Sequence, residues 1–415
     1  MNRVYPPVRG ATGRVLRDLA HSFARDGWHV TVVTCGETAG QELDGMVRVV
    51  RVKGPEKPKG VLGYVWIWIK MMVVALRLKR RHLVVSLSDP PLVIVAGRIV
   101  AFIKGSHHIN WCHDLYPDVM PALGMKVPEW LMRVLKKISR AAMQSCDRVI
   151  VNGRCMARLL SNDGVDPRRI VMIPNWPDLE LVEPNLPGEE QEDGFFHSDT
   201  VEGMRPHDEQ IKTDLRFRVL YSGNLGLAHP IDTVLDAAAI LQGEASDIEF
   251  VFVGDGKGFD YVADQRTKRG LENVRFLPYQ PASKLREIME SGDVHLITMK
   301  DEAAGCIVPS KLYAALAVAR PCIFIGPEQT ETAKVIQDFK TGVVVGNGDA
   351  EDLAEAIRIF RNDGQIWFAA HRGAAQAREI FTPYESLDAW VERAFSTIKD
   401  DLREGAVPRK KRRAA

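Results

Sequence analysis

The chain has 415 residues, of which 46% are hydrophobic and 26% are charged, as in ordinary globular proteins, so a disordered chain, a coiled coil and a collagen-like repeat are excluded. Lys and Arg (55) nearly balance Asp and Glu (54), so no chain-wide positive field favours nucleic acid as a partner. The six cysteines lack the spacing of metal ligands, and we expect no metal and a reducing, cytoplasmic location.

The first 180 residues alternate short β-branched runs with amphipathic stretches. This alternation predicts a parallel sheet covered by helices on both faces. The predicted strands are residues 29–34, 46–53, 83–88, 108–112, 148–151 and 170–173. The predicted helices are residues 13–26, 64–80, 128–142 and 154–162.

The start of the chain departs from this pattern. A sheet of this type normally begins with a central strand that leads into the first glycine loop, but only Asn2–Tyr5 precede the loop here. Either the true start lies upstream, which we favour, or the first domain lacks its first strand. A missing central strand would leave its two neighbours unpaired.

Residues 181–215 are acidic and poor in apolar periodicity, which predicts a linker or insert between domains of residues 1–180 and 216–382. In the second domain we expect strands at 217–221, 248–253, 274–277, 294–298, 321–325 and 342–345. Expected helices are 231–242, 259–269, 282–291, 311–319, 330–339, 350–362 and 366–380. Residues 383–415 form a closing helix and a basic tail. The fold class is α/β, with two Rossmann-like domains facing across a cleft.

Candidate functional residues of the first domain follow predicted strands. Gly10 and Gly13 form a turn that leads into a helix, where backbone N–H groups can meet phosphate; an ordinary strand-to-helix turn is equally consistent. His113 and Asp114 follow the strand at 108–112, at the sheet edge where such folds bind ligands. They could handle protons or sugar hydroxyls, although a lone His is more often structural.

The second domain offers glycine turns and a cation. Gly223, Asn224 and Gly226 follow its first strand and could present backbone N–H groups to a diphosphate, while Gly254 opens a second, weaker glycine loop. Lys311 lies in the first turn of a predicted helix, where the dipole disfavours a cation. We therefore expect an anionic ligand between Lys311 and that helix.

Two segments of the first domain raise the question of a membrane. Residues 61–81 combine Trp66, Trp68 and several Lys and Arg, and residues 128–140 form a basic amphipathic helix. Such helices can lie in a bilayer interface, or they can simply pack on the sheet. A basic run at 409–413 could add to the attraction. Lys and Arg interrupt every long apolar stretch, so we expect no spanning helix.

Six motifs in order carry a family resemblance: YPPVRGATGRVLRDLAHSFARDGWHVTVVT, WCHDLYPDVMPALG, IPNWPD, YSGNLGLAHPIDTVLDAA, FVFVGDG and PSKLYAALAVARP. With them the chain resembles the retaining glycosyltransferases of the GT-B type, family 4. The resemblance is greatest to the bacterial subgroup that builds surface polysaccharides, such as colanic-acid and O-antigen fucosaminyl transferases. It covers nearly the whole chain apart from the first strand and residues 183–214.

The resemblance implies that the first domain receives a glycan acceptor, in this subgroup a lipid-linked one, at the inner face of the membrane. The second domain would hold a nucleotide-sugar, with UDP as the expected nucleotide, and no cofactor. Gly10 and Gly13 would face the donor phosphates or the acceptor, and His113, with Asp114 beside it, the transferred sugar.

For the donor, the resemblance implies that Gly223, Asn224 and Gly226 bind the diphosphate, that Lys311 neutralises it and that Tyr279 lies near the base. Catalysis would then be electrostatic and metal-free, with retention of anomeric configuration.

The sequence departs from the family at the donor loop. Many members carry two Glu eight positions apart, where this chain has Cys306 and Ala314. Glu302, Ser310 or backbone amides of residues 303–307 are the candidate substitutes. Two alternatives therefore stay open: a non-catalytic scaffold of this fold, which would bind no donor, and a nucleotide-sugar epimerase, which would need no acceptor.

Overall fold

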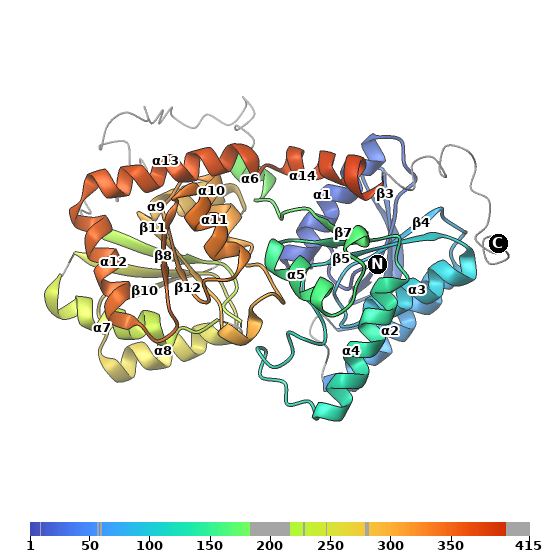
Figure 1. Ribbon diagram of the computed structural model, residues 1–415, viewed down its shortest axis with the longest axis horizontal. Coiled ribbons are helices and arrows are strands. Elements are labelled where there is room, and N and C mark those ends of the chain that lie inside the picture. The colour runs from blue at the N-terminus through green and yellow to red at the C-terminus, as the bar shows by residue number, and fades with distance from the viewer. Residues whose placement is uncertain are drawn as a thin grey trace.

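The computed structural model describes most of the chain as two α/β domains lying side by side (Figure 1). The expected linker beyond residue 182, Tyr279 and the basic tail lie outside the described residues. The described ranges are residues 1–8, 10–55, 58, 60–182, 216–226, 229–245, 247–278 and 282–395.

The first domain contains two sheets, with strand orders β1-β3-β2 and β4-β5-β6-β7. All neighbours pair in parallel except β2, which is antiparallel to β3. The strands are β1 (Thr31–Gly36), β2 (Gly40–Asp44), β3 (Val47–Lys53), β4 (Leu83–Ser86), β5 (His107–Cys112), β6 (Arg148–Val151) and β7 (Ile170–Met172).

The residues that precede the glycine loop occupy the gap between the two sheets. Asn2 N–H donates to Val33 O of β1 (3.2 Å), while Met1 O accepts from Leu87 N (3.1 Å), just beyond β4. Arg3 N–H likewise donates to Asp89 O (2.6 Å), and Arg3 O accepts from Cys35 N–H of β1 (3.0 Å). The expectation that a missing first strand leaves β1 and β4 unpaired is therefore wrong, because a short extended segment bonds to both.

Helices cover both faces of these strands (Figure 1). They are α1 (Ala11–Arg25), α2 (Gly60–Arg77), α3 (Val93–Lys104), α4 (Glu129–Gln144), α5 (Arg154–Asn162) and α6 (Leu179–Val182), with a 3₁₀ turn at Pro167–Arg169. The sequence prediction missed α3 and β2. In α3 nearly every position is apolar, so no helical periodicity shows, and the short β2 is mostly polar and exposed.

The second domain has one six-stranded parallel sheet with order β10-β9-β8-β11-β12-β13. Its strand β9, next to the edge strand β10, is buried along its whole length, as expected for a strand covered on both faces. The strands are β8 (Phe217–Ser222), β9 (Ile248–Val253), β10 (Val274–Leu277), β11 (Val294–Thr298), β12 (Cys322–Ile325) and β13 (Gly342–Val345).

The helices of this domain agree closely with the predicted ones. They are α7 (Asp232–Glu244), α8 (Lys257–Arg269), α9 (Leu285–Ser291), α10 (Lys311–Ala317), α11 (Glu331–Phe339), α12 (Ala350–Asn362) and α13 (Gly364–Ile380), with 3₁₀ turns at Ala282–Lys284 and Asp301–Ala303.

After α13 the chain returns to the first domain (Figure 1). There α14 (Pro383–Ala389) and a π-helical turn (Trp390–Ala394) pack on its core. The fully buried Trp390 ring meets that of Trp111 edge-on, 4.9 Å between centroids, so the last described helix ties the two domains together.

Candidate active site

Two glycine turns meet at the carboxyl ends of β8 and β9. Gly254 has φ +140°, and a Cβ there would lie 2.4 Å from Gly223 O, so only glycine fits. Gly223 N–H donates to Val253 O (2.8 Å) and Leu225 N–H to Asp255 O (3.0 Å). These two amides hold the turns together and are already bonded. The expectation that this turn presents its backbone N–H groups to a diphosphate therefore does not hold for Gly223.

Lys311 reaches the same turn from the first residue of α10. Its Nζ donates to Asn224 O (3.0 Å) and lies 4.8 Å from the centre of the Tyr221 ring. No carboxylate of the described residues forms an ion pair with it. Burial lowers the pKa of Lys311 to about 8. A partly buried cation without a carboxylate partner among the described residues favours an anionic ligand.

A second partly buried group, His229, lies near this cation. Its Nδ1 is 2.8 Å from Thr298 O, which can only accept, so Nδ1 carries the proton and Nε2 is an acceptor. Burial, and then the charge of Lys311, lower the pKa of His229 to about 3. Gly226 completes the turn between Asn224 and His229 and is half-buried.

In the first domain, His113 is buried at the carboxyl end of β5 and packs on the Trp111 ring. Asn152, which follows β6, donates from Nδ2 to His113 Nδ1 (3.0 Å). The proton of the neutral ring is then on Nε2, which has no partner in the described structure. Burial lowers the pKa of His113 to about 3, so His113 is a neutral hydrogen-bond donor.

Asp114 lines a small pocket at the carboxyl edge of β4 and β5. Ser88 Oγ donates to its Oδ2 (3.1 Å), and burial raises its pKa to about 6. The Asn110 side-chain oxygen, also in this pocket, is buried and has no partner among the described residues. The remaining lining includes Tyr116 and Ser139. Asp114 and Asn110 can therefore accept hydrogen bonds from hydroxyl groups that reach the pocket.

The first glycine loop is packed on the extended segment before it. A Cβ at Gly13 would lie 2.8 Å from Val4 Cγ1 and 3.1 Å from Val4 O, so Gly13 lets α1 begin against this backbone. Gly10 is exposed at the N-terminus of α1. Close packing on Val4 thus explains both glycines, since a Cβ at Gly10 would lie 2.9 Å from Val4 Cγ1.

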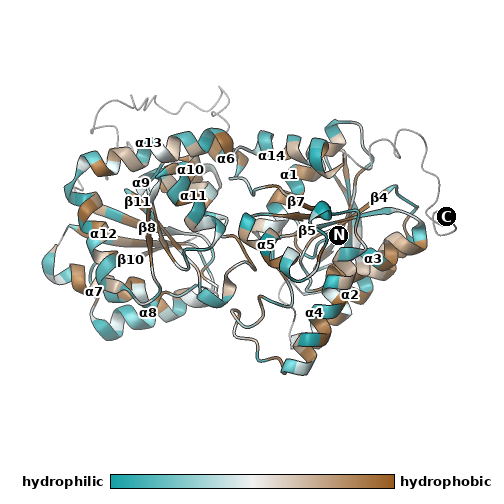
Figure 2. Ribbon diagram, in the orientation of Figure 1, coloured by the Kyte–Doolittle hydropathy of each residue, from teal (hydrophilic) through white to brown (hydrophobic). Residues whose placement is uncertain are grey.

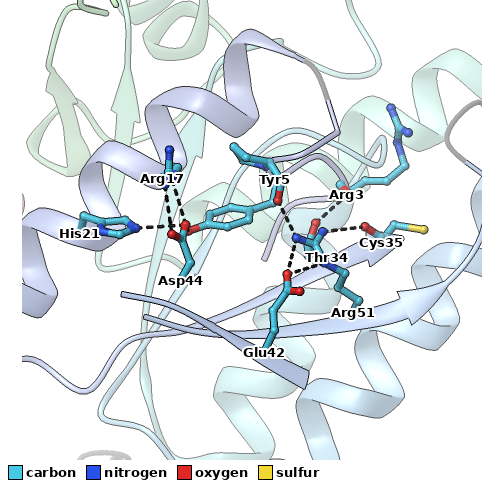
Figure 3. A network of polar contacts seen from close by, with 10 residues as sticks. Arg3, Tyr5, Arg17, His21, Thr34, Cys35, Glu42, Asp44 and Arg51 are labelled. Carbon is cyan, nitrogen blue, oxygen red and sulfur yellow. Dashed lines mark hydrogen bonds and ion pairs between the residues drawn. The ribbon is translucent and has the colours of Figure 1, made fainter. Parts of the chain in front are cut away.

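A network of polar contacts connects the residues before this loop with α1, β2 and β3 (Figure 3). Tyr5 donates to Asp44 Oδ2 (2.9 Å), and Arg17 of α1 pairs with the same carboxylate (2.8 Å). Arg51 of β3 donates to the Pro6 carbonyl. The β2–β3 hairpin therefore holds the turn that begins α1.

The loop before α10, which contains Cys306, contacts the first domain directly. Leu115 N–H, two residues after His113, donates to Cys306 O (2.8 Å), and Cys306 is buried. The position where relatives often carry a Glu thus makes a backbone contact between the domains here. Glu302 is exposed and Ser310 half-buried, and neither is placed by a side-chain hydrogen bond that the structure records.

An ion pair joins the domains beside this loop. Glu331, buried at the start of α11, accepts from Arg154 N (2.6 Å) and from Arg154 Nε (3.1 Å). Arg154 also pairs with Asp338 (2.8 Å). Sequence reasoning missed this pair and Asn152, because each acts on a residue far away along the chain and no local motif marks them.

Two family profiles match the chain, one in each domain. A "Glycosyl transferase 4-like domain" matches residues 10–176, and "Glycosyl transferases group 1" matches residues 207–379. Together they cover most of the chain.

Two curated proteins similar to this chain are named as glycosyltransferases. The chain is 26% identical over 282 residues to a probable glycosyltransferase, WbjE, of Pseudomonas aeruginosa, covering 68% of this chain and 66% of the relative. It is also 26% identical over 278 residues to a putative colanic acid biosynthesis glycosyl transferase, WcaI, of Escherichia coli (strain K12), covering 65% and 64%. The alignments thus span just under two thirds of each relative's length.

Solved structures share the fold over nearly the full length. Sucrose-phosphate synthase from Thermosynechococcus elongatus superposes with a TM-score of 0.70 at 16% identity, covering 94% of both chains. Anabaena HepE, solved with UDP and glucose, gives 0.68 at 19% identity, covering 95% of this chain and 98% of HepE. The chain belongs to the glycosyltransferases of the GT-B fold, with a glycosyl transferase 4-like domain followed by a group 1 domain.

Proposed function

We propose that this protein transfers a hexosyl or hexosaminyl sugar from a UDP-sugar to a lipid-linked glycan, with retention of anomeric configuration, in the synthesis of a bacterial surface polysaccharide. The names of WbjE and WcaI support the reaction class and the process. The UDP bound to HepE supports the choice of nucleotide.

Lys311 carries the proposal. It is a partly buried cation whose Nζ donates to the Asn224 carbonyl, and the described residues place no carboxylate in an ion pair with it. A leaving diphosphate gains negative charge in the transition state, and a fixed cation in a dry site stabilises that charge strongly. In the proposal Lys311 supplies this stabilisation and no metal is required.

The first domain supplies the groups for the sugar and the acceptor. His113 Nε2–H, unpartnered in the described structure, donates to a hydroxyl of the transferred sugar. Asp114 and Asn110 accept from the acceptor's hydroxyl groups in their pocket. Because the His113 ring stays neutral, it adds no charge that would oppose an oxocarbenium-like centre.

A thermal-shift panel of UDP, GDP and ADP tests the donor site. A nucleotide at 100 times its Kd stabilises the folded protein by about 2.7 kcal/mol. We expect UDP to raise the Tm of the wild type but not of Lys311→Ala. Lys268→Ala, which removes an exposed cation of α8 in the same domain, is the matched control and should keep the full shift.

Other outcomes distinguish the alternatives. No shift with any nucleotide would contradict the proposal and favour a scaffold, for which the missing Glu pair at Cys306 and Ala314 is the motive. A shift with UDP, together with conversion of a UDP-sugar in the absence of acceptor, would favour an epimerase.

A further inference from the structure

One fully buried aromatic residue, Tyr221 near the end of β8, lies between the core of the second domain and Lys311. Figure 2 shows the hydrophobic strands in the middle of this domain. The Tyr221 ring is 5.7 Å from the ring of Phe252 on β9, which is ordinary core packing. Lys311 Nζ lies over the same ring, 4.8 Å from its centre. Tyr221 therefore contacts both the core and the cation.

The Tyr221 hydroxyl is held by two hydrogen bonds. It donates to Asn224 O (3.2 Å), the carbonyl that also accepts from Lys311 Nζ (3.0 Å). Thr298 donates to the Tyr221 hydroxyl in turn. Burial raises the pKa of Tyr221, so the hydroxyl keeps its proton and stays a donor. Both lone pairs of Asn224 O are then in use, and Tyr221 and Lys311 meet at one atom.

The side chain of Lys311 is also confined along its length. A Cβ at Gly223 would lie 3.5 Å from Lys311 Cε, so the lysine runs close along the glycine turn. A free lysine side chain loses much conformational entropy when it becomes fixed. In this structure the glycine turn, the Tyr221 ring and the Asn224 carbonyl hold the lysine before any ligand binds.

An aromatic ring attracts a cation without neutralising it. The negative face of the ring attracts the ammonium group, whereas a carboxylate in the same place would cancel the charge and occupy the N–H donors. An ammonium group has three N–H donors, and Asn224 O accepts from one of those of Lys311. Two donors and the full positive charge therefore stay available to an anion.

We propose that Tyr221 is a positioning residue for the transfer reaction, because its ring holds the Lys311 ammonium group beside the glycine turn where the leaving diphosphate would lie. The role rests on the proposed function, since it assumes that Lys311 stabilises this diphosphate. Electrostatic stabilisation is strongest when the stabilising charge is already in place as the reaction proceeds. Tyr221 touches no reacting atom and acts through Lys311 alone.

Two substitutions separate the Tyr221 ring from its hydroxyl, and calorimetry of UDP binding compares them. Tyr221→Leu removes both groups and should raise the Kd for UDP on the order of tenfold, the loss expected for one partly buried cation–π contact. Tyr221→Phe keeps the ring and should bind UDP within about twofold of the wild type. The Kd for uridine, which has no diphosphate, should be the same in all three proteins.

Phe250→Leu is the matched control, because Phe250 is fully buried in the same core and lies opposite Val219 in the sheet. It removes a ring of similar size and should cost folding stability as Tyr221→Leu does. It should nevertheless bind UDP like the wild type, because the ring beside Lys311 is intact. A loss of UDP affinity equal to that of Tyr221→Leu would assign the effect to core packing.

A double variant tests whether Tyr221 acts through Lys311. Adding Tyr221→Leu to Lys311→Ala should cost no further UDP affinity. A further loss, equal weakening of UDP and uridine, or a Tyr221→Phe as weak as Tyr221→Leu would overturn the positioning role. A wild type that binds no UDP would contradict the proposed function itself, whereas equal UDP binding by the wild type and Tyr221→Leu would contradict the positioning role alone.

Discussion

The two domains share an α/β plan but build their halves of the site differently. In the second domain, the glycine turns after β8 and β9 touch through backbone atoms, and one cation rests on them. In the first domain, buried side chains such as His113 and Asn152 meet across neighbouring strands. The comparison teaches that a backbone turn is specified locally, whereas a side-chain pair depends on which strands lie next to each other.

The outer surfaces differ as well. Most of the large exposed apolar side chains of the first domain lie on α2, α3 and α4, together with a net positive charge, whereas those of the second domain are scattered over several helices and strands. The second domain is thus a unit around one continuous sheet, whereas the first domain also presents an apolar and basic surface.

The largest expected effect on the rate of transfer comes from the second domain, whose part of the site consists of the two glycine turns and Lys311. Lys311→Ala should lower kcat/KM for transfer on the order of 10²-fold or more, because it removes the cation beside the leaving diphosphate. Steady-state kinetics measure kcat/KM of this variant, with Lys268→Ala as the control. Near-normal turnover of Lys311→Ala would show that the glycine turns stabilise the leaving diphosphate without this cation.

The contact between the two glycine turns can be broken directly. Gly254→Ala places a methyl group 2.4 Å from Gly223 O at φ +140°, and we expect a loss of about 3 kcal/mol in the free energy of unfolding. In contrast, a Cβ at Gly243, on α7, meets nothing within 4 Å, so Gly243→Ala should stabilise by about 0.5–1 kcal/mol. Equal denaturation midpoints for the two variants would contradict this packing.

Affinity for UDP should depend on pH through Lys311. Its pKa is about 8 without a ligand, and a bound diphosphate would raise that value because the anion favours the charged amine. Affinity should therefore stay constant below about pH 8 and fall up to about tenfold per pH unit above it. Calorimetry across this range measures the effect, and Lys311→Arg should remove the dependence since Arg stays protonated.

The hydrogen bond between Asn152 and His113 should have the smallest effect on the rate of transfer. Asn152→Ala should slow transfer about fivefold, the worth of roughly 1 kcal/mol for a neutral hydrogen bond, with the UDP shift unchanged. Asn152→Asp should instead raise the pKa of His113, because a carboxylate favours the imidazolium, and should add a pH dependence to the rate.

A double mutant tests whether Asn152 acts through His113. If it does, Asn152→Ala combined with His113→Ala should lose no more rate than His113→Ala alone. Additive losses would assign Asn152 a role of its own.

The sequence predicted the glycine turns and Lys311 because their residue types and their places after strands are local signals. It missed α3, whose uniform apolar composition hides its period, and β2, which is short and polar. It also expected that a missing first strand would leave two neighbouring strands unpaired, whereas Met1–Arg3 bond to both sides. The predicted Tyr279 contact lies outside the described residues and stays a prediction.

The sequence by itself determined the alternation of strands and helices, the order of the glycine turns and the residues available for chemistry. Only the tertiary structure decided that Asn152 meets His113, that Arg154 binds Glu331, and that one row of α2 stays in water. The reason is physical: hydrophobic periodicity records which residues avoid water but not what covers them. Contacts between distant residues form only when strands and helices pack.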